Sequence, residues 1–174
     1  ERLQIADLGT GSGCLLLALL SNLPQAEGTG VEADPAAAAL ARENITACGL
    51  AARAGVFEGA WSDWTGWTRA DLIISNPPYI ASGVIASLEP EVKDYDPGAA
   101  LDGGEDGLEA FREIIRLGGA YMKRGVPLVL EIGHDQRRAV QALLSAAGFT
   151  GLGHRPDLGG NDRCVWGYAP GRAS

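Results

Sequence analysis

The stretch LQIADLGTGSG, residues 3–13, decides the fold of this chain. It begins as an apolar run typical of a buried strand and ends in three glycines at alternate positions, Gly9, Gly11 and Gly13. The apolar segment 13–23 follows at once and predicts a short helix. A strand, a glycine turn and a helix in this order predict an α/β unit whose turn presents backbone N–H groups at a helix N-terminus.

Strand and helix patterns alternate from this stretch to the end of the chain. In the second helix, Asp34 suits the N-cap, Pro35 the first turn and Gly49 the end. The alternation predicts an α/β fold with a doubly wound, mostly parallel sheet covered on both faces. Strands are predicted at 3–9, 27–33, 52–59, 70–76, 126–133 and 163–169, and helices at 13–23, 34–49, 105–125 and 135–149.

Ligands of such sheets bind beyond the carboxyl ends of the strands, at the point where the winding changes direction. The first and fourth predicted strands flank that point if the sheet is doubly wound. The glycine turn and the loop after residues 70–76 are therefore expected to share one crevice.

Composition narrows the classes of protein to which the chain can belong. With 174 residues, 46% of them hydrophobic, one domain is expected. The longest apolar run, residues 14–20, is far shorter than the ~20 residues that span a bilayer, and no signal peptide is visible. Three widely spaced cysteines give neither a disulfide framework nor zinc spacing, so we expect a reduced, cytoplasmic setting without a metal site.

The charge of the chain argues against a nucleic-acid partner. The net charge is −8, and residues 88–107 hold seven acidic residues and one lysine. A surface that follows phosphates has the opposite bias. Because the chain enters a strand at once and lacks an initiator methionine, we also expect it to be a piece of a longer protein.

Asp7 decides which ligand suits the glycine turn. A dinucleotide-binding turn would carry a third glycine where this sequence has Cys14. A carboxylate at Asp7 repels a pyrophosphate but attracts a cation, and S-adenosylmethionine carries both a sulfonium and an ammonium. The turn therefore predicts a site for this methyl donor; an ordinary tight strand–helix turn is the alternative.

Two further side chains are candidates for the same ligand. Glu32 ends the second predicted strand, where an acid can accept hydrogen bonds from both ribose hydroxyls; a solvated strand end is the alternative. Trp61 follows the third predicted strand and suits an adenine ring; a buried aromatic in a small satellite cluster is the alternative. The sequence leaves both pairs of alternatives open.

The segment SNPPYI, residues 75–80, ends the fourth predicted strand. Proline cannot donate to a sheet and stiffens the residue before it, so Asn76 and Pro77 form a rigid corner. The Asn76 side-chain oxygen and the Pro77 carbonyl are two fixed acceptors for an NH2 group, and Tyr79 can stack on the flat group behind the nitrogen. The corner predicts methylation of an amide or aryl amine, mostly by positioning and without a catalytic histidine. A plain turn is the alternative.

Five segments of the chain, in the same order, resemble the HemK/PrmC family of protein-glutamine methyltransferases: DLGTGSG, NPPYI, EPEVKDYDPGAALDGGEDGL, LEIG and GGNDRCV. The resemblance implies a Rossmann-like class I S-adenosylmethionine-dependent methyltransferase fold with an antiparallel last strand. It implies methylation of the glutamine amide nitrogen (N5) in the Gly-Gly-Gln motif of class 1 peptide-chain release factors, with S-adenosylhomocysteine as product.

The resemblance also implies which residues act. Catalysis falls to Asn76, Pro77 and Tyr79. Pro78 joins these three in binding the glutamine substrate. The implied donor contacts are Gly9, Thr10, Gly11, Ser12, Gly13, Glu32, Trp61 and Asn76, and Asp7 joins them on the argument from its charge given above.

Two departures from the family pattern stand out. Ala60 occupies a position where many members have an aspartate, so an adenine-side contact is missing or replaced. Nothing corresponds to the family's N-terminal helical domain that docks the release factor. We therefore expect residues 1–174 to be a single methyltransferase catalytic domain.

Three other functions stay open at this point. An amino-methyltransferase acting on RNA or DNA shares the corner but needs a basic track or a recognition domain. A methyltransferase acting on a ribosomal-protein glutamine is a nearer alternative. A non-catalytic S-adenosylmethionine-binding scaffold has no need of two acceptors in the corner.

Overall fold

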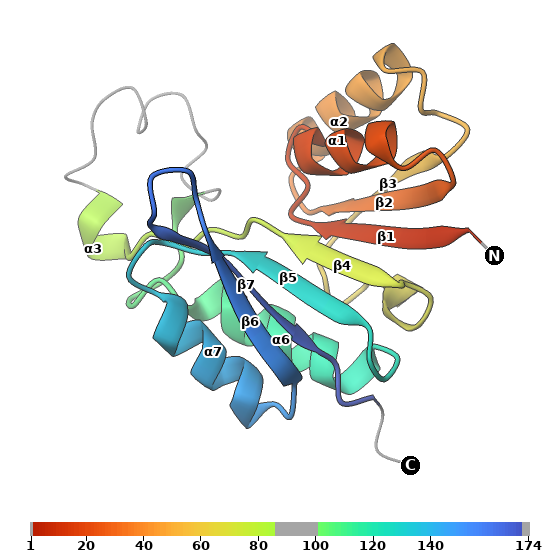
Figure 1. The fold of residues 1–174 in the computed structure, drawn as a ribbon. Helices are drawn as coiled ribbons and strands as arrows, with labels where there is room; N and C mark the ends of the chain where they lie inside the picture. The colour runs from red at the N-terminus through yellow and green to blue at the C-terminus, as the bar shows by residue number, and fades with distance from the viewer. Residues whose placement is uncertain (1, 86–100, 172–174) are drawn as a thin grey trace.

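One seven-stranded sheet forms the centre of the computed structural model, which describes residues 2–85 and 101–171 (Figure 1). The strand order is β3-β2-β1-β4-β5-β7-β6. Neighbours from β3 to β5 are parallel, whereas β7 runs antiparallel to both β5 and β6. The predicted doubly wound, mostly parallel sheet with an antiparallel last strand is confirmed. The strands are β1 Leu3–Leu8, β2 Ala26–Glu32, β3 Ala54–Glu58, β4 Leu72–Ser75, β5 Pro127–Glu131, β6 Thr150–Pro156 and β7 Asp162–Tyr168.

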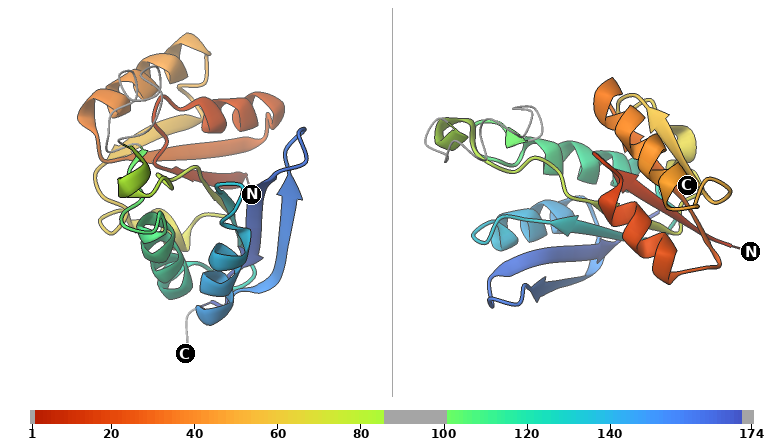
Figure 2. Two further views of the ribbon diagram at one scale, coloured as in Figure 1. Left: turned by 90° about the vertical axis from the view of Figure 1, so that its left-hand side faces the viewer. Right: turned by 90° about the horizontal axis from the view of Figure 1, so that it is seen from above.

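Helices cover both faces of this sheet. Ile5 of β1 packs in a cluster with residues of α1 and α2, while Ala6 and Leu8 pack in a larger cluster with residues of α6 and α7. Alternate residues of a strand point to opposite faces, so the two helix pairs lie on opposite sides (Figure 2). In the described parts of the chain, no helix has the length and apolar composition that crossing a membrane requires. The helices are α1 Cys14–Asn22, α2 Pro35–Ala47, the 3-10 helix η1 Thr65–Thr68, α3 Ser82–Ile85, α6 Glu109–Tyr121 and α7 Arg137–Ala146.

The boundaries of α2 follow from local chemistry. The Asp34 side chain accepts a hydrogen bond from the Ala37 backbone N–H at 3.0 Å, and Pro35 is the first helical residue. Gly49 adopts a φ of 71°, a left-handed conformation that ends the helix. The cap, the first turn and the end of this helix are confirmed as predicted.

Two predictions of secondary structure are wrong. No strand was predicted at β6, whose sequence TGLGHRP lacks an apolar alternation because β6 is a mostly exposed edge strand that pairs with β7. The helix predicted from residue 105 begins at Glu109, because Gly107 has a φ of 72° that no α-helix contains. Of the acidic segment 88–107, residues 88–100 lie outside the described residues.

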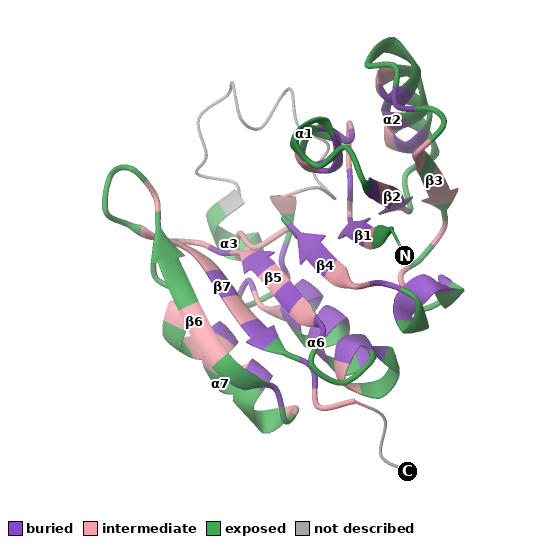
Figure 3. Cartoon of the chain, turned by 45° about the vertical axis from the view of Figure 1, so that its right-hand side comes forward, coloured by how far each residue is buried: buried purple, intermediate pink, exposed green. Residues whose placement is uncertain are grey.

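The winding of the sheet changes direction between β1 and β4. Leu8 and Ser75 are paired in register at the carboxyl ends of these two strands. The buried Ser75 hydroxyl donates a hydrogen bond to the Leu8 carbonyl at 2.6 Å. The glycine turn after β1 and the corner after β4 therefore leave from adjacent strand ends, as predicted. Figure 3 shows that β1 and β4 are largely buried, in contrast to β6.

Candidate functional site

The glycine turn after β1 is fixed by its own backbone. Gly9, Gly11 and Gly13 have φ values of 67°, 55° and 86°, which other residues rarely adopt. The Gly13 N–H donates to the Thr10 carbonyl at 2.8 Å, closing the turn. The Thr10 side chain packs onto Gly30 of β2, where an added Cβ would lie 2.6 Å from Thr10 Cγ2. The turn therefore lies directly on the neighbouring strand.

Asp7 is a buried carboxylate beneath this turn. It is 1% exposed, and its Oδ2 accepts a hydrogen bond from the Thr10 hydroxyl at 2.7 Å. Its Oδ1 is buried without a hydrogen-bond partner among the described residues. Burial raises the pKa of Asp7 to about 6; the Thr10 hydroxyl and the Leu16 backbone N–H oppose this shift, and the nearby Glu32 carboxylate adds to it. The Leu16 N–H at the start of α1 thus acts on this carboxylate without forming a short hydrogen bond to Oδ1. A buried carboxylate with one short hydrogen bond suits a ligand that brings a cationic N–H group.

Glu32, at the end of β2, belongs to the hydrogen-bond network of the glycine turn. Its Oε2 accepts from the Gly11 N–H at 2.8 Å and its Oε1 from the Asp34 N–H at 3.0 Å. Each carboxylate oxygen has a second lone pair, so the group can still accept from ligand hydroxyls. The structure thus places Glu32 beside the turn and partly buried.

Trp61 lies next to the glycine turn as well. Its Cζ2 atom is 3.6 Å from where a Cβ on Gly9 would stand, and the ring is partly buried against the main core. Its carbonyl accepts a hydrogen bond from the Trp67 indole N–H at 2.9 Å, which fixes its backbone. The preceding Ala60 is exposed. The structure supports both a core contact and a position beside the turn for this indole.

The corner after β4 displays one side chain and buries the next. Asn76 is exposed and makes no hydrogen bond to another described residue, whereas Pro77 is buried and anchors the corner. Pro78 and Tyr79 are partly buried. Within residues 2–85 and 101–171, no side chain or backbone group engages the Asn76 amide, which lies exposed at the carboxyl edge of the sheet.

Tyr79 is supported by the end of β5 and the start of β7. Burial, followed by the nearby Glu131 carboxylate, raises the pKa of the Tyr79 hydroxyl, and Arg163 opposes the shift. Arg163 donates to the Ile132 carbonyl at 3.2 Å and pairs with Asp157 at 3.3 Å. These contacts place residues of the LEIG and GGNDRCV segments against the tyrosine of the corner.

The described part of the acidic loop packs against the same corner. Ile80 donates its N–H to the Leu101 carbonyl at 3.1 Å, and Gly103 donates to the Ile80 carbonyl at 2.8 Å. A Cβ on Gly103 would lie 2.8 Å from the Cα of Tyr79. A glycine is therefore needed at position 103 for this close approach.

The structure brings the predicted residues to two adjacent strand ends. The donor candidates surround the end of β1, and the corner follows β4. Sequence reasoning missed three residues that hold these segments: Ser75, Gln136, and Asn44, whose side-chain N–H donates to the Ser12 carbonyl at 2.9 Å. No motif marks them, because each acts through a hydrogen bond to a distant backbone carbonyl.

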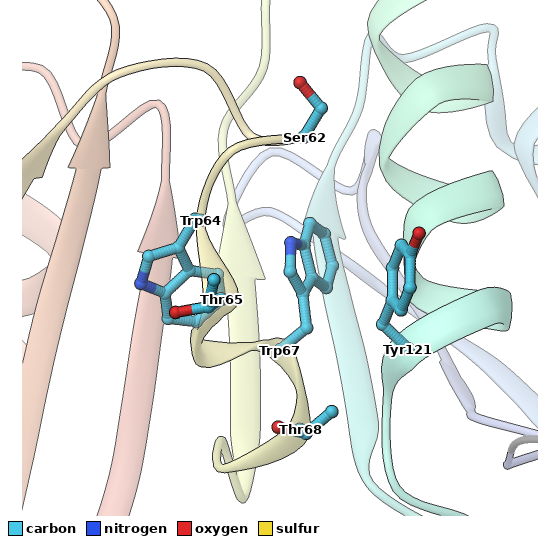
Figure 4. Close-up of a pocket in the computed structure, with 6 residues that line it drawn as sticks. All are labelled: Ser62, Trp64, Thr65, Trp67, Thr68 and Tyr121. Carbon is cyan, nitrogen blue, oxygen red and sulfur yellow. The ribbon is translucent and has the colours of Figure 1, made fainter.

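A separate pocket of about 290 Å³ lies between η1 and the C-terminal end of α6 (Figure 4). It contains no carboxylate, amine or imidazole, and its two indole rings, Trp64 and Trp67, lie 5.7 Å apart. None of the predicted site residues lines it, so the candidate site is the edge of the sheet and not this pocket. The pocket is lined by Ser62, Trp64, Thr65, Trp67, Thr68 and Tyr121.

Several known proteins that are similar to this chain are methyltransferases. A release factor glutamine methyltransferase from Caulobacter vibrioides is 47% identical over 164 residues, which are 94% of this chain and 57% of that relative. A methyltransferase from Pyrococcus furiosus has the same fold, with a TM-score of 0.71 at 16% identity over 97% of this chain and 77% of that one. The N-terminal domain of human METTL16, solved in complex with SAH, gives a TM-score of 0.66 at 16% identity, covering 97% and 62%.

The family comparison covers the part of the chain that holds the candidate site. The model of the methyltransferase small domain matches residues 1–88, half of the 174 residues. This range includes the glycine turn, Glu32, Trp61 and the corner. The chain therefore belongs to the family of the methyltransferase small domain.

Proposed function

We propose that this chain transfers a methyl group from S-adenosylmethionine to the glutamine side-chain amide in the Gly-Gly-Gln motif of class 1 peptide-chain release factors. The observation that carries the proposal is the buried, unpartnered Asp7 oxygen at the end of β1, one strand away from the exposed Asn76 after β4. The similar protein from Caulobacter vibrioides bears the name of this activity. This chain spans 57% of the length of that relative. We therefore propose residues 1–174 as a methyltransferase catalytic domain.

The residues at the end of β1 fit the methyl donor. When bound, S-adenosylmethionine supplies a methyl group on a positively charged sulfur. The unpartnered Asp7 oxygen would accept a hydrogen bond from its ammonium group. The turn from Gly9 to Gly13, with Thr10, Gly11 and Ser12, would contact the donor closely, because its glycines carry no side chains. Glu32 would accept hydrogen bonds from the ribose hydroxyls, and Trp61 would pack on the adenine ring. Asn76 would contact the donor from the side of the corner. In the same fold, METTL16 holds SAH, the demethylated product.

The residues of the corner fit the acceptor. The Asn76 oxygen and the Pro77 carbonyl would each accept one hydrogen of the glutamine NH2 group, and Tyr79 with Pro78 would contact its flat amide. Held in this way, the nitrogen lone pair is directed at the methyl carbon. The N–C bond forms as the C–S bond breaks, and one amide proton then leaves to water. The step needs no side-chain base, because that proton becomes acidic once the nitrogen has been methylated.

The proposal includes a cytoplasmic place of action and no metal, membrane or direct nucleic-acid partner. The net charge of −8 and the acidic residues near the corner, Asp102, Glu105 and Asp106, support a protein acceptor over RNA or DNA. Methylation of a ribosomal-protein glutamine uses the same corner, and an enzyme with that specificity would leave the release factor unmethylated in the acceptor test below.

The acceptor is tested by incubating the chain with labelled S-adenosylmethionine and alternative substrates. A class 1 release factor should gain one methyl group on the Gly-Gly-Gln glutamine, located by tandem mass spectrometry. A release factor with Gly-Gly-Ala in its place is the matched control and should gain none. RNA and DNA oligonucleotides should gain none even at low salt, where phosphate contacts are strongest. Robust methylation of adenine or cytosine would refute the assignment.

Tyr79→Phe and Tyr79→Ala separate the ring of this residue from its hydroxyl. The hydroxyl faces Glu131 and Arg163, so Tyr79→Phe should keep most of kcat/KM. Tyr79→Ala removes the stacking surface, and an aromatic contact of about 0.5–1.5 kcal/mol corresponds to a loss of up to about tenfold. Tyr121→Ala, in the separate pocket, is the control and should leave steady-state kinetics unchanged. Equal kinetics for all three variants would show that Tyr79 does not contact the acceptor.

A further inference from the structure

Gln136, immediately before α7, contacts three segments that are far apart in the sequence. Its Nε2 donates hydrogen bonds to the carbonyls of Tyr79 at 2.9 Å and Gly107 at 3.1 Å. Its Oε1 accepts from the Gly133 N–H at 2.9 Å. Both amide hydrogens and the amide oxygen are thus used, each by a different backbone segment.

The packing around this amide is tight. Gly107 has a φ of 72°, and a Cβ there would lie 2.5 Å from the Tyr79 oxygen and 2.8 Å from Gln136 Nε2. Gly103 contacts the corner at the same place, where a Cβ would lie 2.9 Å from the Pro78 oxygen. The glycines of the loop 101–108 therefore leave just the space that the Gln136 amide fills.

The corner depends on contacts from outside itself. Pro77 and Pro78 have no N–H group, so these residues cannot hold the corner through backbone donors of their own. The Tyr79 carbonyl is instead held by a side chain from the start of α7. If the Gln136 amide N–H groups are lost, the carbonyls of Tyr79 and Gly107 lose the hydrogen-bond donor that they share. Proteins avoid partly buried carbonyls without a hydrogen-bond partner.

We infer that Gln136 is a positioning residue for methyl transfer. By fixing the Tyr79 carbonyl against the loop 101–108 and the end of β5, it sets the direction in which Asn76 and the Pro77 carbonyl face the acceptor. This inference rests on the proposed function. It assigns the effect of Gln136 to the turnover step, because the hydrogen bonds of Gln136 go to Gly133, Tyr79 and Gly107 and to none of the donor candidates.

Gln136→Glu tests the inference because it keeps the size of the side chain and the Oε1 acceptor but removes both donors. We expect kcat to fall about 10- to 100-fold, the loss that a small misplacement of reacting groups produces. The donor affinity from calorimetry and the KM for the release factor should stay within about twofold of the unmodified chain, as a loss confined to positioning requires. Gln136→Met, which has similar length and no donor, should behave in the same way and covers the case in which the carboxylate disturbs folding.

Gln141→Glu is the matched control. Gln141 lies on α7 and donates one hydrogen bond to the Gly153 carbonyl of β6 at 3.3 Å, away from the corner. Its kcat should match that of the unmodified chain. Amide hydrogen exchange of Ile80 and Gly103, which form hydrogen bonds between the corner and the loop, should accelerate in the Gln136 variants and not in the control.

The outcomes separate this inference from the function on which it rests. If the unmodified chain transfers methyl groups and both Gln136 variants turn over as fast as Gln141→Glu, the inference is overturned alone. A rise in KM or a loss of donor affinity with kcat unchanged also overturns it. If the unmodified chain transfers no methyl group to the release factor, the proposed function fails, and the inference fails with it.

Discussion

Asn76→Ala is expected to lower kcat for methylation of the release factor by about 10²–10³, or roughly 2.7–4 kcal/mol. The reason is that its side-chain oxygen would hold an amide hydrogen whose nitrogen becomes positively charged as the methyl group is transferred. An acceptor fixed in place before the reaction gains strength as that charge develops. The measurement is single-turnover kinetics at saturating donor, because Asn76 is also proposed to contact the donor.

Asn76→Asp and Asn22→Ala are the controls for this result. Asn76→Asp keeps an oxygen acceptor at the same place and should retain much more activity than Asn76→Ala. Asn22 is exposed on α1, where its amide donates to the Ala18 carbonyl, and Asn22→Ala should turn over normally. If Asn76→Ala folds, binds donor normally and methylates at the unmodified rate, the corner is a plain turn.

Asp7→Asn is expected to weaken donor binding by about one to two decades, because a hydrogen bond to a charged group contributes roughly 1.5–3 kcal/mol. The same substitution should raise the free energy of unfolding at pH 7. Burial raises the pKa of Asp7 from 3.8 to about 6, so the folded protein binds a proton more tightly than the unfolded chain. The resulting stability is fully present below pH 3.8 and is lost as the pH rises through about 6. Asn cannot ionise, and the gain at pH 7 is at most about 3 kcal/mol.

Two measurements check this pair of effects. Isothermal titration gives the affinities for S-adenosylmethionine and for S-adenosylhomocysteine, and chemical denaturation from pH 4 to 8 gives the free energy of unfolding. The stability of the unmodified chain should fall between pH 4 and 7 relative to that of Asp7→Asn, and its donor affinity should fall below pH 6 as Asp7 becomes protonated. Unchanged donor affinity in Asp7→Asn, or tight binding of NAD in place of the donor, would contradict the assignment of the turn.

Sequence reasoning located the features that depend on local chemistry. The strand, glycine turn and helix at residues 3–23 are set by an apolar run and by glycines that permit positive φ. Asp34 marks the start of α2 because its side chain satisfies an N–H that the helix leaves open. The neighbouring positions of the turn and the corner followed from the topology of doubly wound sheets, since the alternation of elements fixed the class.

The features that sequence reasoning missed depend on partners outside the segment itself. β6 is stabilised by pairing with β7, and its own residues, with two glycines and one proline, carry no strand pattern. Gln136 resembles any polar residue near a helix N-terminus until the carbonyls of Tyr79 and Gly107 are placed beside it. Ser75 likewise gains its role from the Leu8 carbonyl on another strand. The hydrogen bonds of Gln136 and Ser75 to these carbonyls join residues separated by 29 to 67 positions, which no local pattern reports.

The pairing of β1 with β4 has a consequence for how such proteins diverge. The donor candidates from Asp7 to Trp61 precede the connecting segment 62–71 in the sequence. The residues that would bind or support the acceptor follow this segment, and Asn76 is the first of them. The two sets meet along four register pairs and the Ser75 hydrogen bond. A recombination event within residues 62–71 that preserves the pairing of β1 with β4 would replace all of the acceptor residues together. Such an exchange would change the substrate while the proposed methyl-donor site is kept.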